Sequence, residues 1–249
     1  MNDGTTSRLS KRVALTDPRD KGLLIAFEGP DGSGKTTQHK LFKSWLRSQF
    51  QDVVTTKWNS SPVFKPIIKA RKAARTLNPL AYAVLHAADF WHRYETIVQP
   101  ALQEGKVVLA DRYVFTGLAR DVARGKDRNW CASLYANARK PDLVFYFDAP
   151  VEVCATRIAA GRDFKFYEAG QDVTGEADAL QSYLNFTPSI VAEYKRLHEQ
   201  FGFAIVDAKL PVYEQHRFIR QTFIESYGDR TSPATVEPQL SAFLSEVDV

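Results

Sequence analysis

The chain has 249 residues, of which 44% are hydrophobic and 25% are charged, a composition that excludes a disordered or fibrous protein. The 33 basic and 29 acidic residues give a net charge of +4, which suits phosphate-bearing ligands but is too small to indicate a nucleic-acid partner. No apolar run approaches the roughly 20 residues that cross a bilayer, so we expect no membrane partner.

The two ends of the chain differ from its middle. Residues 1–20 and 226–249 have mixed polarity and no clear periodicity, which predicts an N-terminal and a C-terminal arm around one domain at 21–225. The first 20 residues are too polar for a secretory signal, so we expect a cytoplasmic protein. The two cysteines, Cys131 and Cys154, lie in segments predicted to be helical, which excludes a disulfide framework or a zinc site.

Short apolar runs rich in β-branched or aromatic residues predict five strands, at 22–28, 53–58, 106–110, 143–148 and 203–207. Most are continuous apolar strings, which is typical of parallel strands covered by helices on both faces. Helical stretches separate the runs, so the sequence predicts an α/β fold with right-handed crossovers.

The main helices are predicted at 34–50, 79–104, from Pro150 onward, 175–200 and 211–227. Pro150 stands where proline fits best, at the start of a helix. Because proline breaks helix interiors, we expect the stretch 175–200 to form two helices that are separated at Pro188.

A glycine-rich loop follows the first predicted strand. It matches the pattern G-x-x-x-x-G-K-[ST] and reads Gly29-Pro30-Asp31-Gly32-Ser33-Gly34-Lys35-Thr36-Thr37. The backbone N–H groups of such a loop and the start of the following helix bind a nucleotide's β-phosphate, so we predict ATP or GTP binding. Lys35 is expected to reach the β- and γ-phosphates, and the Thr36 hydroxyl to ligate Mg²⁺.

The residues around this loop narrow the class. Residues 27–38 resemble the opening of the thymidylate kinases, and the resemblance continues through Ala87-Ala88-Asp89, Asp111-Arg112-Tyr113 and Pro141-Asp142 with the strand 143–148. It covers about residues 21–225. It implies the P-loop NTPase fold, a five-stranded parallel sheet with a mobile lid, and a possible homodimer. The implied activity is transfer of the ATP γ-phosphoryl group, with Mg²⁺, to a (deoxy)nucleoside 5′-monophosphate, either dTMP or a relative (EC 2.7.4.9 or a related nucleotide kinase).

The resemblance implies roles for three further residues. In the family, the arginine at the position of Arg112 grips the acceptor's phosphate, and the aspartate before it, here Asp111, helps to organise Mg²⁺. A structural ion pair is the alternative for these two residues. The carboxylate in the loop, here Asp31, contacts the 3′-hydroxyl of the acceptor sugar in the family; an aspartate that stabilises a turn is the alternative.

The stretch 157–172 resembles the family's lid over ATP. Some members carry a catalytic arginine in the loop, at the position of Gly32 in this chain, and others carry it in the lid. Because Gly32 has no charge, we expect Arg162 to be catalytic, with Arg157 and Lys165 in support. Tyr167 corresponds to a tyrosine that packs on the deoxyribose in part of the family. A solvated charged loop is the alternative.

The acceptor side departs from the family. No arginine follows the second strand, where Trp58 is expected to stack or to close the sheet edge, and Asn59 to bind phosphate. His86 and Phe90 occupy the positions where the family reads the base with a phenylalanine and an arginine. Arg120 and Asp121 replace aromatic, amide or hydroxyl groups. One hypothesis is that Asp121 accepts a hydrogen bond from an exocyclic amino group; a surface ion pair is the alternative.

Further hypotheses follow from these departures. The acceptor need not be dTMP: a nucleoside, a modified base in DNA or a small metabolite is an alternative, and so is a protein that binds ATP without catalysis. Five cations without an acid lie on a helix predicted near Pro62: Lys65, Lys69, Arg71, Lys72 and Arg75. They indicate either a solvated face or a surface for a polyphosphorylated or polymeric acceptor.

Overall fold

The computed structural model describes residues 15–16, 21–49 and 52–228. The predicted arms at 1–20 and 226–249 lie largely outside these residues. Thr16 forms an isolated parallel bridge with Arg139, in which the Thr16 N–H donates to the Ala138 carbonyl at 3.0 Å. No helix in the described part of the chain is long and apolar enough to span a membrane.

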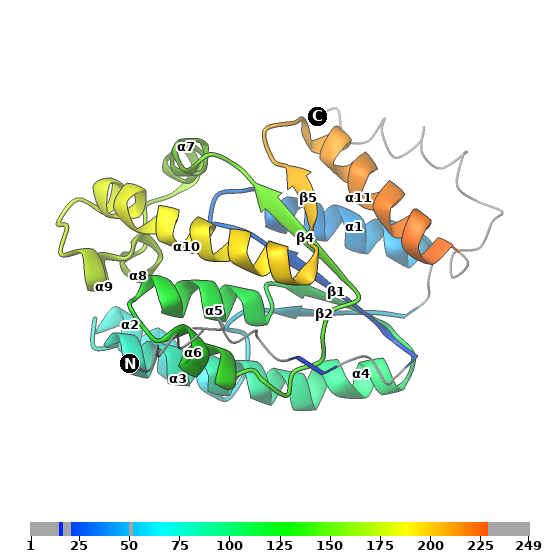
Figure 1. Ribbon diagram of the computed structural model, residues 1–249, viewed down its shortest axis with the longest axis horizontal. Helices are drawn as coiled ribbons and strands as arrows, with labels where there is room; N and C mark the ends of the chain where they lie inside the picture. Colours follow the sequence, from blue (N-terminus) through cyan, green and yellow to red (C-terminus); the bar gives the residue numbers. More distant parts are fainter. Residues whose placement is uncertain (1–14, 17–20, 50–51, 229–249) are drawn as a thin grey trace, which may run out of the picture.

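Five parallel strands form one sheet in the order β2-β3-β1-β4-β5 (Figure 1). They are β1 (Leu23–Glu28), β2 (Val53–Lys57), β3 (Val107–Asp111), β4 (Leu143–Asp148) and β5 (Ala204–Asp207). The five predicted strands and the parallel α/β fold are therefore confirmed, with each bound correct to within one residue.

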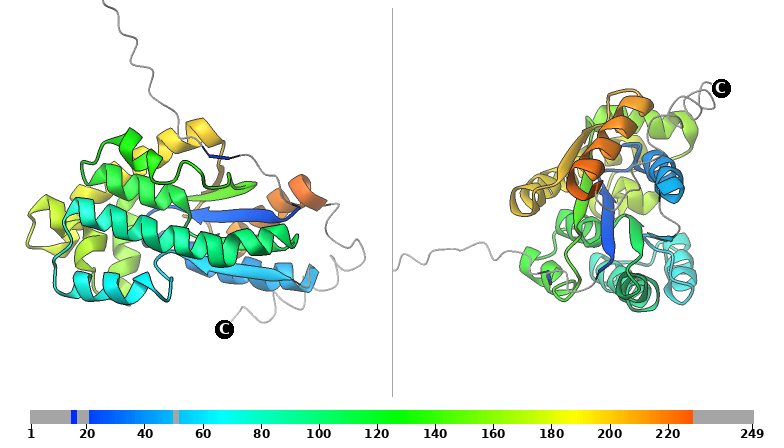
Figure 2. Two further views of the ribbon diagram at one scale, coloured as in Figure 1. Left: turned by 90° about the horizontal axis from the view of Figure 1, so that it is seen from below. Right: turned by 90° about the vertical axis from the view of Figure 1, so that its right-hand side faces the viewer.

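The central strand β1 explains why its sequence is continuously apolar. All six of its residues are buried, and successive side chains enter two different cores. Leu23, Ile25 and Phe27 pack with helices α1 (Lys35–Gln49) and α11 (Val212–Tyr227) on one face. Leu24 and Ala26 face the helices of the other layer, chiefly α3 (Pro79–Arg93), α5 (Val114–Ala123) and α10 (Ala179–Phe201) (Figures 1 and 2).

Two predicted helices differ from the structure in their details. The stretch 79–104 is helical throughout, but a π-helical turn, η1 (Tyr94–Val98), joins α3 to the short α4 (Gln99–Gln103) next to Pro100. Pro100 has no backbone N–H to donate to the preceding turn, and the wider π-helical turn fits this missing hydrogen bond. The Asn78 side chain caps the start of α3 by accepting from the Ala81 N–H at 2.8 Å.

The expected break at Pro188 was wrong, because α10 is a single helix of 23 residues with Pro188 inside it. Proline in a helix interior costs about 3 kcal/mol. Phe186, Ile190 and Tyr194 are buried against the second core, and burial of three such side chains, at about 1.5–3 kcal/mol each, exceeds that cost.

The remaining helices lie around the carboxyl ends of the strands. They are α2 (Phe64–Ala73), α6 (Arg128–Ser133), α7 (Val151–Gly161), α8 (Phe166–Ala169) and α9 (Gln171–Thr174). The connections that follow β1 and β3 run in opposite directions along the sheet. From β1 the chain passes through α1 to β2 at one edge, and from β3 it passes through α5 toward β4 on the other side of β1. Doubly wound sheets bind their ligands at such a switch point.

Candidate active site

One cavity of about 870 Å³ opens at the carboxyl ends of β1, β2 and β3. It brings together most residues that the sequence singles out: Asp31, Gly32, Gly34, Lys35, Thr36, Thr37, Trp58, Asn59, Asp111, Arg112, Arg120, Arg157, Arg162, Lys165 and Tyr167. Lys57, Tyr82 and Glu168 also line it and are not among the predicted site residues. Lys72 lines it as well, although the sequence placed it only in the basic run of the helix near Pro62. Gly29 and Ser33 belong to the loop without lining the cavity.

The glycine-rich loop requires glycine at defined positions. Gly29, Gly32 and Gly34 have φ values of 140°, 83° and 91°, which are conformations that side-chain-bearing residues rarely adopt. A Cβ atom at Gly32 would lie 2.4 Å from the backbone oxygen of Cys154 in α7. The packing of α7 on the loop therefore excludes an arginine at position 32.

Lys35 is the first residue of α1 and lies inside the loop. Its Nζ donates to the Pro30 carbonyl at 2.5 Å and to the Ser33 Oγ at 3.1 Å. Burial and the nearby Arg112 charge lower the pKa of Lys35 to about 7, against the opposing effect of Asp31 and Asp111. A phosphate group has the charge to replace these neutral acceptors and keep the ammonium protonated.

Thr36 and Asp111 meet beside this lysine, where the Thr36 Oγ1 donates to the Asp111 Oδ2 at 3.3 Å. No cluster of three histidine, cysteine, aspartate or glutamate side chains that would hold a metal occurs in the described part of the chain. One hydroxyl and one carboxylate nevertheless fit Mg²⁺, which keeps several water ligands and takes others from substrate phosphates.

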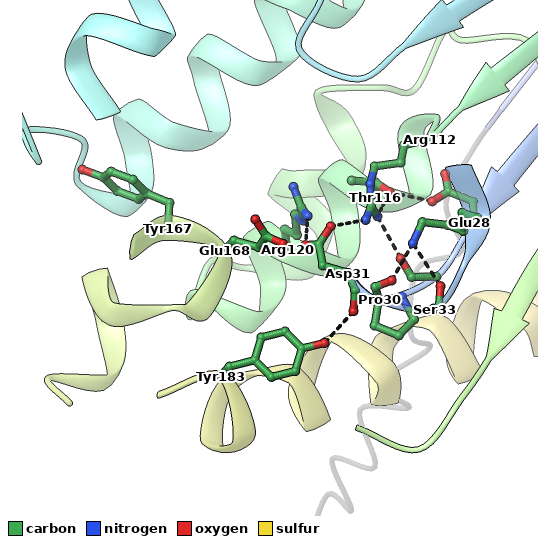
Figure 3. A network of polar contacts seen from close by, with 12 residues as sticks. Glu28, Pro30, Asp31, Ser33, Arg112, Thr116, Arg120, Tyr167, Glu168 and Tyr183 are labelled. Atoms are coloured by element: carbon green, nitrogen blue, oxygen red, sulfur yellow. Dashed lines mark hydrogen bonds and ion pairs between the residues drawn. The ribbon is translucent and has the colours of Figure 1, made fainter. Parts of the chain in front are cut away.

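Asp31 pairs with two arginines, Arg112 from the end of β3 and Arg120 from α5 (Figure 3). Its Oδ1 accepts from the Arg112 Nη2 at 2.5 Å, and its Oδ2 accepts from the Arg120 Nη2. Burial alone would raise the pKa of Asp31, but the two guanidinium charges outweigh it and hold the pKa well below the usual range. Arg120 therefore pairs with the loop aspartate, and the alternative of a surface ion pair with the neighbouring Asp121 is wrong, because Asp121 is buried.

The buried Glu28 helps to position Arg112 through Thr116, which hydrogen-bonds both residues. Arg112 has a φ of 74°, and its Nη1 donates to the Gly29 carbonyl at 2.8 Å and to the Thr116 Oγ1 at 3.2 Å. Glu28 accepts from the Tyr113 N–H at 2.7 Å, and from Thr116 and Tyr194. Burial raises the pKa of Glu28 in spite of these hydrogen bonds. The sequence predictions missed this role of Glu28. The signal that could have revealed it is an acidic residue at the end of an otherwise apolar strand.

Two of the lid cations, Arg162 and Arg157, already have partners in this structure. Arg162 lies at the end of α7 and pairs with Glu168 of α8, while Arg157 donates to the Ala208 carbonyl at 2.8 Å. Tyr167 is buried, and its hydroxyl accepts from the Leu77 N–H at 2.9 Å. Figure 3 shows Tyr167 and Glu168 on the same short helix.

Arg124, at the end of α5, ties the lid to the rest of the cavity wall. Its Nε donates to Asp172 at 2.8 Å and its Nη2 to the Tyr167 carbonyl at 2.5 Å, while its guanidinium lies 4.0 Å from the centre of the Tyr82 ring. Nothing in the local sequence distinguishes this arginine from Arg120, so the sequence predictions missed it.

The turn after β2 is fixed by a second buried pair. Asp89 of α3 accepts from the Ser61 N–H at 2.8 Å and from the Arg93 Nε at 2.8 Å, and Arg93 in turn donates to Thr56. Trp58 precedes this turn, lines the cavity and is only 7% exposed, so it both closes the sheet edge and presents a ring to the cavity. Asn59, at a φ of 57°, also lines the cavity.

Three predicted acceptor residues do not line the cavity. Phe90 is 1% exposed and packs among the rings of Tyr113, Trp91 and Tyr135, so it is a core residue. Asp121 is also buried, both carboxylate oxygens lack a hydrogen-bond partner among the residues described, and burial raises its pKa to about 7. It does not reach a ligand's amino group in this geometry. His86 lies behind the cavity wall, where it contacts Lys72.

This strand order, with the glycine-rich loop after β1 and a cation at the neighbouring strand end, is the architecture of P-loop phosphotransferases. The family model for thymidylate kinase matches residues 27–219 of this chain. The chain therefore belongs to the thymidylate kinase family.

Curated relatives agree with this assignment. "Probable thymidylate kinase 2" of Saccharolobus solfataricus is 40% identical over 203 residues, which cover 81% of this chain and 95% of that protein. "Probable thymidylate kinase" of Pyrococcus abyssi is 32% identical over 206 residues, 80% of this chain and 94% of that protein. "Thymidylate kinase" of Clavibacter sepedonicus is 36% identical over 152 residues, 57% of this chain and 70% of that protein.

Family membership confirms the expected enzyme class. The chain is a nucleoside monophosphate kinase that resembles thymidylate kinase, a transferase with ATP as its phosphate donor (EC 2.7.4.9). The family and the relatives do not favour the alternatives of a different phosphoryl acceptor or of a non-catalytic ATP-binding protein.

Proposed function

We propose that this enzyme transfers the γ-phosphoryl group of ATP to the 5′-phosphate of dTMP or a close relative. The observation that carries the proposal is that one cavity joins the glycine-rich loop, the Asp31–Arg112–Arg120 cluster and a wall of aromatic rings. Phosphoryl transfer needs the donor and acceptor in line and needs cations around the transferred group. The cavity provides these cations, and the glycine-rich loop and the aromatic wall offer separate sites for the donor and the acceptor.

The donor's phosphates bind in the loop. The backbone N–H groups of residues 29–34 and the start of α1 surround the β-phosphate, and Lys35 exchanges its Pro30 and Ser33 partners for phosphate oxygens. Thr36 and Asp111 hold Mg²⁺, which neutralises phosphate charge. Thr37, which also lines the cavity, hydrogen-bonds a phosphate from the first turn of α1.

The acceptor binds between α5 and α2. Arg112 binds its phosphate because the guanidinium lies beside the loop, where that phosphate must meet the γ-phosphate. Asp31 accepts from a sugar hydroxyl and holds Arg120 in place. Trp58, Asn59 and Tyr167 form the wall beyond this point. The base therefore lies among aromatic rings, where a planar ligand stacks.

The lid supplies the cation that the loop lacks. Because α7 leaves no space for a side chain at Gly32, Arg162 is the catalytic cation, and Arg157 and Lys165 assist it. In the ligand-free geometry Glu168 neutralises Arg162. When ATP is present, its phosphates compete with Glu168 for the guanidinium.

The family resemblance also supports a homodimer. Ile67 of α2 and Leu80 and Val84 of α3 are between 47% and 52% exposed, although all three are large apolar side chains. The two helices contact each other, so these side chains offer a surface that a second copy would cover. Light scattering after gel filtration tests this, and a monomer across the micromolar range would contradict it.

A panel of acceptors tests the proposed reaction. The enzyme is incubated with ATP, Mg²⁺ and, one at a time, dTMP, dUMP, dCMP, dGMP, dAMP and unphosphorylated thymidine, and both products are identified. We expect one ADP and one nucleoside diphosphate per turnover with dTMP or a relative. Thymidine should be inert, because it has no phosphate for Arg112. Phosphorylation of thymidine, or ATP binding without ADP formation across the panel, would contradict the proposal.

A further inference from the structure

The end of the cavity farthest from the glycine-rich loop has one lysine among aromatic rings. Tyr82 and Tyr167 stack with ring centres 5.8 Å apart, and the ammonium of Lys72 lies 4.9 Å from the centre of the Tyr82 ring. Lys72, Tyr82 and Tyr167 all line the cavity. Lys72 belongs to α2, the helix whose run of cations had no assigned role.

The structure separates Lys72 from the other cations of this run. Lys65, Lys69, Arg71 and Arg75 are exposed, whereas Lys72 is only partly exposed and turns into the cavity. Arg75 stacks on the Phe166 ring, with 4.6 Å between the guanidinium and the ring centre. The basic face is therefore mostly solvated, and one of its members contributes to the ligand site.

His86 holds the Lys72 ammonium in position. The His86 ring lies between Tyr82 and Trp58, with its Nδ1 2.7 Å from the Tyr82 carbonyl and its Nε2 3.0 Å from the Lys72 Nζ. The carbonyl can only accept, so Nδ1 carries the proton and Nε2 accepts from Lys72. Burial and the Lys72 charge lower the pKa of His86 well below its usual range, which keeps the ring in this neutral form.

This geometry leaves donors free for a ligand. A lysine ammonium has three N–H bonds and no acceptor. Among the residues that the structure describes, His86 is its one hydrogen-bond partner, and no carboxylate forms an ion pair with it. Burial lowers the pKa of Lys72, as do the charges of Arg120 and Arg124, whereas Tyr82 and Asp31 raise it.

We propose that Lys72 determines the base specificity of the acceptor by donating a hydrogen bond to a ring carbonyl oxygen, with His86 as its positioning residue. The inference rests on the proposed function: a phosphate held at Arg112 beside the loop places the base at the opposite, aromatic end, where Lys72 lies. Because lysine cannot accept from an amino group, a base with a carbonyl at that atom, such as thymine, is preferred over one with an amino group, such as cytosine.

Lys72→Met tests this against Lys69→Met, an exposed lysine on the same helix that does not line the cavity. We expect K72M to lower kcat/KM for dTMP by about 10- to 100-fold, mainly through KM, and to lower the ratio of dTMP to dCMP activity by about tenfold. The KM for ATP should stay within about twofold, and K69M should match the wild type in every measurement.

Two further variants separate recognition from a structural role. Lys72→Gln can both donate and accept, so it should shift the preference toward dCMP. It also serves as the second test if K72M does not fold. His86→Gln keeps an acceptor for Lys72 and a donor for the Tyr82 carbonyl, so it should retain the dTMP preference that His86→Leu loses. A fall of dTMP and dCMP activity in equal proportion, or a K72M variant that behaves like K69M, would overturn the inference.

The wild-type measurements distinguish this failure from that of the proposed function. If the wild type phosphorylates none of the nucleoside monophosphates, the proposed function fails and the role of Lys72 fails with it. If the wild type phosphorylates dTMP but K72M keeps the same dTMP to dCMP ratio, only the role of Lys72 is overturned.

Discussion

The two ends of the cavity are built in different ways. The donor end is built mainly on one continuous segment, residues 29–37, whose backbone N–H groups and glycine conformations shape the phosphate site; Asp111 joins it from another strand. The acceptor end takes its side chains from five separate segments, namely the turn after β2, α2, α3, α5 and α8; examples are Trp58, Lys72, Tyr82, Arg120 and Tyr167. A local motif therefore defines the phosphate site, whereas the specificity for the acceptor depends on how distant helices pack.

The cations of the two ends also differ in their ligand-free partners. Lys35 has only neutral acceptors, Pro30 and Ser33, and its pKa is lowered to about 7. Arg112 and Arg120 share the carboxylate of Asp31 instead. Phosphate binding at the donor end thus adds a negative charge beside a lysine that has no carboxylate partner in the described part of the chain. At the Asp31–Arg112–Arg120 cluster, a phosphate must instead compete with the Asp31 carboxylate for the arginines.

The largest effect is expected at the donor end. Lys35→Ala removes the one cation inside the loop, so turnover should fall by about 10⁴-fold, within the range that phosphate-binding cations contribute in such sites. Steady-state ADP release with dTMP as acceptor measures it. Lys40→Ala is the matched control, because Lys40 is exposed on the same helix and should leave turnover unchanged. A loss below about tenfold in K35A would show that the backbone alone binds the donor.

The same difference explains how much the sequence could predict. The strands and the loop depend on short segments, so the apolar runs predicted all five strands and the motif predicted the P-loop. Helical spacing placed His86 and Phe90 on one helix, but it does not determine how deep each side chain lies. Phe90 is in the core and His86 is behind Lys72. Pro188 shows the same limit of prediction from local sequence. Proline disfavours the interior of a helix, but the buried contacts of α10 outweigh that preference.

The lid connects the two ends, and its cation is expected to have the second largest effect. Arg162→Ala should lower kcat by about 10³-fold with a smaller change in either KM, because the guanidinium acts on the transferred group. Arg157→Ala and Lys165→Ala, measured in the same assay, should each cost less. Near-normal turnover in R162A together with a large loss in R157A or K165A would transfer the catalytic role to that residue.

The smallest expected effect is the uptake of a proton when ATP binds, which concerns the donor end alone. With a pKa of about 7, free Lys35 is mostly neutral at pH 8, and ATP phosphates would raise that pKa and protonate it. ATP binding at pH 8 should therefore take up close to one proton, since the nucleotide's own phosphates are already ionised there. Calorimetry in two buffers with different ionisation enthalpies measures this uptake.

The size of this proton uptake depends on pH, and that dependence links the proton to Lys35. As the pH falls from 8 toward 6, free Lys35 becomes charged before ATP arrives, so its share of the uptake decreases. Lys35→Met should remove the uptake at pH 8, measured at nucleotide concentrations high enough to saturate the weakened site, whereas Lys40→Ala should keep it. If K35M takes up as many protons on ATP binding as the wild type, the proton binds elsewhere. The contrast between Lys35, which has no carboxylate partner among the described residues, and Arg112 and Arg120, which are paired with Asp31, would then no longer hold.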